Sequence, residues 1–276
     1  TRMGGLQPIV SLPNLSTVAA SLRQAPKQSR SIIKRFSGNL ETVIERKPRQ
    51  KKVWDLPTRV FHWVLVANVV FSYVTASLGE YELHQVSGLS ILILIVFRVF
   101  WGLFGGRHAR FSSFLRGPAH VIAYCRAVAR REPDHGVGHN PLGALSILAM
   151  LTILALQASL GLFANDDASF KGLLYHLVDP ETSNSITSWH HRVFLFGVVS
   201  LVILHLAAIL GYAIMHRKNL VRPMVTGWAK SEIQDDQITS SETVPVDHPV
   251  DGSPLGASVY LAVSIALVLG TIELLQ

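Results

Sequence analysis

The stretch that decides the fold is Trp189–His205, which reads WHHRVFLFGVVSLVILH. Between His191 and His205 its only polar residues are Arg192 and Ser200. Drawn as a regular α-helix that rises ~1.5 Å per residue, it places these two histidines ~21 Å apart along the axis. Fourteen steps of ~100° fall short of four whole turns by about 40°, so both rings point to nearly the same face. Ionisable side chains inside a lipid-spanning helix are costly, and they mark functional sites.

The composition of the 276-residue chain is that of a membrane protein. Hydrophobic residues make up 49% and charged residues only 16%, whereas a soluble domain carries about 25% charge. The net charge of +7 gathers at the ends and in one loop, without the aromatic-interleaved basic stripe that binds nucleic acid. We therefore expect no nucleic-acid partner. The single cysteine, Cys125, excludes an internal disulfide, a Cys-x-x-Cys-His haem attachment and a cysteine-ligated iron–sulfur cluster.

Apolar spans follow one another along the chain. The sequence predicts them at 58–78, 84–104, 141–163, 189–215 and 257–275. Each approaches or exceeds the ~20 residues that cross ~30 Å of hydrocarbon. For the last span, which is apolar until Glu273, the alternative is a helix lying on the membrane surface. We predict an all-α membrane protein, with a four-helix transmembrane bundle and an additional C-terminal transmembrane helix.

The spans divide the chain into regions. We expect a basic N-terminal extension over 1–52, a four-helix domain over 53–218, a polar tether over 219–255 and the fifth helix over 256–276. Residues 22–44 suit an amphipathic helix on the inner surface, and 111–129 suit an interfacial helix with its arginines away from the apolar side. No structure is assigned to the tether, because its composition is polar.

The charges of the loops predict the orientation. Lys and Arg gather before the first span, between the second and third, and after the fourth. The opposite loops are short or acidic, with Glu80 and Glu82 in one of them. The positive-inside rule then places the basic side and the N-terminus in the cytoplasm.

The longest loop on the opposite side, 165–188, is acidic. It carries Asp166, Asp167, Asp179 and Glu181 against the single Lys171. Such a rim would steer a positively charged partner in a salt-dependent way. The alternative is that these acids only solvate the loop.

Four histidines fall at two depths in the spans. His62 and His205 lie toward the basic side, whereas His84 and His191 each open a span from the acidic side. Neutral imidazole is a standard axial ligand of haem iron, so the pairing predicts two bis-histidine haem sites, one in each leaflet. Taken singly, each histidine is more often a hydrogen-bonded structural residue. A proton relay is the alternative for the set, but a relay usually places polar groups between its ends, and only Arg192 and Ser200 lie between His191 and His205.

His190 competes with its neighbour as the ligand on the acidic side. Its fifteen-residue spacing to His205 puts it about 60° off the shared face of a regular α-helix. We therefore favour His191, and His190 stays open as the alternative or as a residue of the outer rim.

Arg98 is a candidate cofactor-binding residue. It follows His84 by fourteen residues near the inner end of the second span, where it would pair with a haem propionate or a quinone headgroup. The alternative is an arginine that snorkels to the membrane edge. Arg59, one turn before His62, has the same two interpretations.

Four short motifs surround these histidines: RVFHW at 59–63, LHQVSG at 83–88, GHNPLG at 138–143 and WHHRVF at 189–194. Together with His205 they resemble the bacterial cytochrome b561 / nickel–iron hydrogenase cytochrome b subunit family over residues 53–222. The resemblance implies two non-covalent b haems whose iron is bound by His62, His84, His191 and His205.

The resemblance also implies partners and a place in the cell. Members pass electrons between a quinone pool and a redox partner outside the membrane, such as a periplasmic c-type cytochrome, a hydrogenase or a dehydrogenase. The expected location is the bacterial cytoplasmic membrane, with a quinone as a further candidate cofactor. The basic extension and the fifth span depart from the four-helix pattern and suggest docking into a larger membrane complex. The competing class is a non-redox scaffold, accessory subunit or proton-coupled transporter. The inverted repeats and broken helices of transporters are not evident in the sequence.

Overall fold

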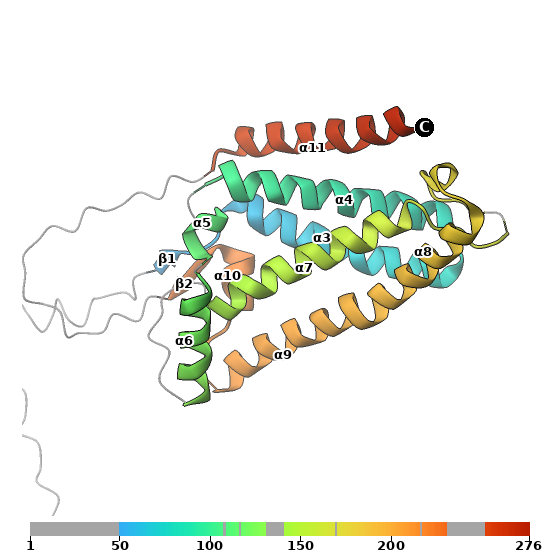
Figure 1. Ribbon diagram of the computed structural model, residues 1–276. Helices are drawn as coiled ribbons and strands as arrows, with labels where there is room; N and C mark the ends of the chain where they lie inside the picture. Colours follow the sequence, from blue (N-terminus) through green and yellow to red (C-terminus); the bar gives the residue numbers. More distant parts are fainter. Residues whose placement is uncertain are drawn as a thin grey trace, which may run out of the picture. The chain divides into compact units, whose positions relative to one another are not determined.

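The computed structural model describes residues 50–106, 109–115, 117–130, 141–168, 170–215, 217–230 and 252–276. They all belong to one compact unit, Gln50–Gln276. Among them are five helices long and apolar enough to cross a membrane (Figure 1). This confirms the predicted all-α membrane fold. The amphipathic helix expected at 22–44 lies outside the described residues.

The long helices run antiparallel to their neighbours in the chain (Figure 1). The first three are α3 (Leu56–Leu78), α4 (Tyr81–Phe104) and α7 (Pro141–Gly161). The fourth span consists of α8 (Pro180–Arg192), the π-helical segment η2 (Val193–Val199) and α9 (Ser200–Met215). The C-terminal helix is α11 (Pro254–Leu275). The short elements are β1 (Gln50–Lys52), α5 (Phe111–Phe114), α6 (Pro118–Ala129), the 3-10 turn η1 (Tyr175–Leu177), α10 (Val221–Thr226) and β2 (Trp228–Lys230).

Local sequence fixes both ends of α3. The buried Asp55 is its N-cap, and the Asp55 carboxylate accepts a hydrogen bond from the Thr58 backbone N–H at 3.1 Å. Pro57 in the first turn suits a helix start, where its missing N–H is not needed. At the other end Gly79 takes a left-handed conformation with φ 76°, which glycine adopts without a Cβ penalty. The chain therefore turns at once into α4.

The fourth span departs from the regular α-helix that its sequence predicts. Val193–Val199 is a π-helix, whose hydrogen bonds close on the fifth residue and not the fourth. Gly197 lies in this segment against α7, where an added Cβ would stand only 2.7 Å from Ile153 Cγ1. The expectation of an unbroken α-helix from Trp189 to Met215 is therefore wrong.

Two further expectations about local structure are corrected. The single interfacial helix expected at 111–129 is broken between α5 and α6, where Leu115 is extended and Pro118 begins a new helix. Gly117 precedes this proline, and a residue in that position avoids the α conformation, which favours a new helix start at Pro118. The first part of the tether also has structure, because α10 and β2 follow α9, and β2 pairs antiparallel with β1.

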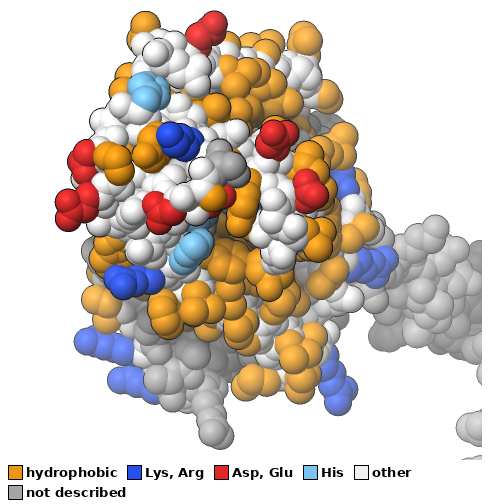
Figure 2. Space-filling view, turned by 90° about the vertical axis from the view of Figure 1, so that its right-hand side faces the viewer, with side chains coloured by type: hydrophobic (Ala, Val, Ile, Leu, Met, Phe, Trp, Pro, Cys, Tyr) orange, Lys and Arg blue, Asp and Glu red, His pale blue; other side chains and the backbone are white. Residues whose placement is uncertain are grey.

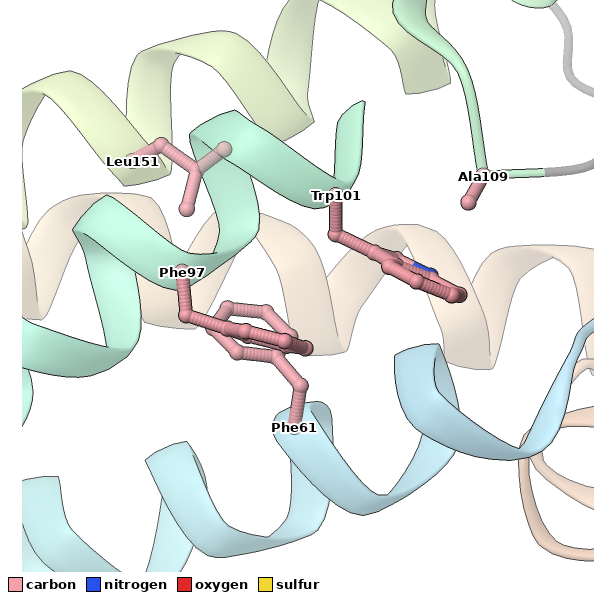
Figure 3. Packing of buried hydrophobic residues seen from close by; sticks show 5 residues of the cluster. All are labelled: Phe61, Phe97, Trp101, Ala109 and Leu151. Atoms are coloured by element: carbon pink, nitrogen blue, oxygen red, sulfur yellow. The ribbon is translucent and has the colours of Figure 1, made fainter. Parts of the chain in front are cut away.

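Buried side chains form three clusters along the bundle. One, drawn in Figure 3, packs Phe61, Phe97, Trp101, Ala109 and Leu151 at the end where α3 begins. A second lies in the middle of the bundle and consists of Ile91, Ile95, Leu154 and Val198. The third joins α11 to the loop after α7 through Leu174, Val268 and Ile272. α11 packs along α4, so the C-terminal helix is part of the same bundle.

Candidate functional site

The bundle has two chemically different ends. We call the end where α3 begins and α4 and α9 finish the basic end, because Arg59, Arg98 and Arg110 lie there. The opposite end, where α8 begins, is the acidic end. Each end holds one pair of histidines.

At the acidic end His84 of α4 faces His190 of α8. Their ring centroids are 6.1 Å apart, and the ring planes are nearly perpendicular. The His84 Nδ1 lies 2.8 Å from the Ser72 carbonyl oxygen and 3.0 Å from its hydroxyl, both on α3. A carbonyl oxygen only accepts, so Nδ1 carries the proton and donates it to Ser72. The Nε2 of His84 is then left with its lone pair, which is the form in which histidine binds metals.

The ring of His190 is held in the same way by α7. Its Nδ1 donates to the Gln157 carbonyl oxygen at 3.0 Å, and its Nε2 lies 3.0 Å from the Gln157 side-chain nitrogen. Gly161 lies directly beneath this ring, because an added Cβ would be 3.2 Å from the His190 Cε1. Both His84 and His190 therefore carry their proton on Nδ1, and the unprotonated Nε2 of His190 accepts a hydrogen bond from the Gln157 side-chain amide.

The spacing of this pair fits a single metal ion between two imidazoles. Two imidazole nitrogens that each bind one metal ion at about 2 Å can lie at most about 4 Å apart. Each ring centroid lies a ring radius further out, which is compatible with the 6.1 Å between the centroids of His84 and His190.

His191, the residue favoured from helical spacing, lies elsewhere. It is exposed, and its ring centroid is 6.1 Å from that of His190. The reason is η2: a π-turn takes one more residue than an α-turn, so it absorbs one position between these histidines and His205. The fifteen residues from His190 to His205 then give the same rotation about the helix axis as fourteen residues of a regular α-helix. The structure thus brings His84 together with His190 and not with His191.

At the basic end His62 of α3 and His205 of α9 are close enough to interact electrostatically. The His62 Nδ1 is buried and has no hydrogen-bond partner. An unsatisfied buried polar atom costs about 1–3 kcal/mol, and a bound ligand at this position would remove that cost. The His62 ring packs edge-on against Trp63, with 5.0 Å between centroids.

Both pairs lack further ligands of the usual kinds. In the part of the chain that the structure describes, no three His, Cys, Asp or Glu side chains gather where they would hold a metal ion. The pairs therefore suit a metal whose other ligands come from an organic group, as the porphyrin of haem supplies them. The middle cluster around Leu154 and Val198 separates the two pairs with apolar side chains.

Arg98 is held within the protein. It is 3% exposed, and its Nη1 donates to the Ala109 carbonyl oxygen at 3.2 Å. Its guanidinium lies 4.8 Å from the centre of the Phe111 ring, and it interacts electrostatically with Asp55. This arginine does not snorkel to the membrane edge. Its role in binding a cofactor stays a prediction.

Ser72 and Gln157 are the site residues that sequence reasoning missed. Both orient a histidine of the acidic-end pair from a neighbouring helix. Gln157 left a weak signal, because it is the only amide side chain in the apolar span 141–163.

Acidic side chains gather at the acidic end of the molecule (Figure 2). Some of them structure the loop: Asp166 accepts hydrogen bonds from two backbone N–H groups of its own turn. Asp179 caps α8 and accepts from the hydroxyl and backbone N–H of Thr182, and these bonds lower the pKa of Asp179. Asp167 and Glu181 are exposed.

Comparison with known proteins adds independent evidence. Residues 53–227 match the family model described as prokaryotic cytochrome b561. A probable Ni/Fe-hydrogenase B-type cytochrome subunit of Azotobacter chroococcum mcd 1 is 27% identical over 218 residues, covering 66% of this chain and 90% of that protein. The probable Ni/Fe-hydrogenase 1 B-type cytochrome subunit of Escherichia coli (strain K12) is 23% identical, covering 64% and 89%. No solved structure matches the chain.

Proposed function

Because this chain belongs to the prokaryotic cytochrome b561 family, whose function is electron transfer by haem b in the membrane, we propose that it relays electrons between two b haems, one near each end of the bundle. The observation that carries the proposal is the pair of histidine sites at opposite ends, above all His84 and His190 with 6.1 Å between their ring centroids. The relay would connect the membrane quinone pool with a periplasmic redox partner.

We propose that four histidines would hold the two haems. His62 and His205 would hold the haem at the basic end, and His84 and His190 the haem at the acidic end. His191 remains the ligand predicted from sequence spacing, and the choice between the two adjacent histidines is open to direct test. Without a haem-attaching cysteine motif in the sequence, both haems would be extractable.

A bound haem supplies a one-electron iron couple, and the chain's own side chains set the conditions for it. The carbonyl oxygens of Ser72 and Gln157 accept the Nδ1 protons of His84 and His190. These bonds fix the orientation of both rings and raise the basicity of their Nε2 atoms. Buried apolar side chains lie between the two ends of the bundle. Such burial and hydrogen bonding are the means by which a protein tunes haem potentials.

The orientation and the partner are part of the proposal. The arginines of the basic end favour a cytoplasmic position by the positive-inside rule, which leaves the acidic end in the periplasm. Several relatives are named as cytochrome subunits of Ni/Fe-hydrogenases. We therefore propose that a hydrogenase-like or c-type cytochrome partner exchanges electrons with the haem at the acidic end.

The first test is the haem content of the purified, detergent-solubilised chain. We expect a pyridine haemochrome assay to give two haem b per chain, and acid–acetone to extract both. A protein with no haem would contradict the proposal and favour a non-redox scaffold or transporter.

A further inference from the structure

Unpaired polar atoms are concentrated where α3 begins. Within the described residues, four buried side-chain nitrogen or oxygen atoms have no hydrogen-bond partner, and three of them belong to Thr58, Arg59 and His62. Thr58 is 4% exposed and precedes His62 by four residues, which places both on one face of the helix. Leaving such atoms unpaired is costly, more so for a charged group. They mark a place where ligand atoms belong.

One nitrogen of the Arg59 guanidinium is hydrogen-bonded to α10, and another has no hydrogen-bond partner. Its Nη1 donates to the Val225 carbonyl oxygen at 2.6 Å, whereas its Nε is buried without a partner. Gly227 lies against the guanidinium, since an added Cβ would be 3.4 Å from the Arg59 Nε and Cζ. One turn further along α3, the Trp63 indole N–H donates to the Met224 carbonyl oxygen at 3.2 Å. The Val225 carbonyl of α10 thus holds Arg59, and the Met224 carbonyl holds Trp63, on either side of His62 in the sequence.

The remaining edge of Arg59 has the chemistry of a carboxylate site. The Nε and Nη2 groups of an arginine donate two parallel hydrogen bonds to one carboxylate, in a geometry that lysine does not offer. The group bound next to His62 in the proposed function carries two carboxylates of its own, the haem propionates. Arg98 is a poorer candidate, because its guanidinium already contacts Ala109 and Phe111 and has Asp55 as a nearby counter-charge.

We propose that Arg59 binds a propionate of the haem held by His62 and His205, and that α10 holds the Arg59 side chain in position. This inference rests on the proposed function. An oxyanion at this place has a second possible source, the phosphate of a lipid headgroup, and the experiment must distinguish the two.

The experiment uses the full chain carrying His84→Ala, so that only the basic-end haem is present. The rate at which haem passes to excess apomyoglobin is measured for Arg59→Gln, for Arg59→Lys and for the matched control Arg222→Gln. Arg222 is exposed on α10 at the same end. We expect Arg59→Gln to lose haem on the order of tenfold faster, because a tenfold change corresponds to about 1.4 kcal/mol, which is near the lower end for a hydrogen bond to a charged group. Arg59→Lys should be intermediate, and Arg222→Gln should match the parent.

A second arm replaces haem by iron protoporphyrin IX dimethyl ester, which has no carboxylates. In the parent we expect the ester to dissociate about as fast as haem does from Arg59→Gln, and the two changes together should add nothing further. If Arg59→Gln accelerates loss of the ester as much as loss of haem, the arginine acts on a lipid phosphate or on the fold, and the inference is overturned.

Failure of the proposed function and failure of the role of Arg59 give different experimental results. Absence of haem from the wild-type chain would overturn the proposed function itself. Two haems in the wild type, with equal retention in Arg59→Gln, would overturn only the role of Arg59. Should Arg59→Gln not fold, Arg59→Lys and the ester in the parent still decide the question.

Discussion

At the scale of single residues, the ring of His190 is oriented by α7 and not by its own helix. Its Nδ1 proton goes to the carbonyl oxygen of Gln157, and its ring lies over Gly161. His191, one residue further on, is exposed. The different environments of two adjacent histidines lead to a direct prediction.

His190→Ala should lower the haem content from two to one per chain, whereas His191→Ala should leave both haems in place. The reason is that the ring of His190, and not that of His191, faces His84. Pyridine haemochrome assays on the two matched variants measure this. One haem in His191→Ala and two in His190→Ala would restore the assignment made from helical spacing.

The ends of the bundle should lose their haems independently. His205→Ala removes a proposed haem ligand at the basic end, and we expect it to spare the acidic-end haem. His84→Ala should do the reverse. Redox titration of the visible spectrum distinguishes the two haems by their potentials. Loss of both haems from a stably inserted single variant would argue against separate sites, and loss of neither would disprove the ligand assignment.

At the scale of elements, η2 sets the angular relation between the two halves of the fourth span. The segment Val193–Val199 absorbs one residue within an otherwise α-helical span. Without it, His190 would be about 60° away from the face of His205. Within this segment the absence of a side chain at Gly197 lets Ile153 of α7 approach the backbone closely.

Deletion of Phe196 should therefore be tolerated. This residue is 72% exposed within η2. Its removal would convert the π-turn to a regular α-helix, and His190 would stay on the same face of the span as His205. The matched control is deletion of Ile203, which is 61% exposed in α9 and has no π-turn to absorb the change. Haem content is the readout: two per chain for the first deletion, and fewer for the second. Loss of the acidic-end haem on deletion of Phe196 would indicate that η2 is not what positions His190.

At the scale of the whole molecule, opposite charges mark the two ends of the bundle. The acidic loop lies next to the histidine pair that faces the proposed periplasmic partner. Two of its acids, Asp166 and Asp179, are engaged in turns and caps. Only exposed acids that do not structure the loop are suitable for testing electrostatic steering.

The double variant Asp167→Asn, Glu181→Gln should slow electron exchange between the acidic-end haem and a cationic carrier such as a basic c-type cytochrome. We expect a reduction of several-fold at low ionic strength, because surface charge raises encounter rates by ~10-fold or more in steered systems. Stopped-flow rates at increasing salt concentrations provide the control, since screening should bring variant and wild type together. A rate that is flat with salt in the wild type would show that this loop is not the docking surface.

The sequence by itself determined the membrane fold and the depth of each histidine. The thickness of hydrocarbon sets the length of a span, so the apolar runs predicted four of the five long helices to within a few residues and placed His62, His84 and His205 at defined depths. The fourth span is the exception, because it begins at Pro180 and not near Trp189. Only the tertiary structure shows which of the two adjacent rings lies against His84, and it is the ring of His190. Rotation about a helix axis depends on which backbone hydrogen bonds form, and a π-turn has no signal in composition or periodicity. The partners of the histidine rings, Ser72 and Gln157, come from other helices, and contacts between helices are fixed only when the helices pack together.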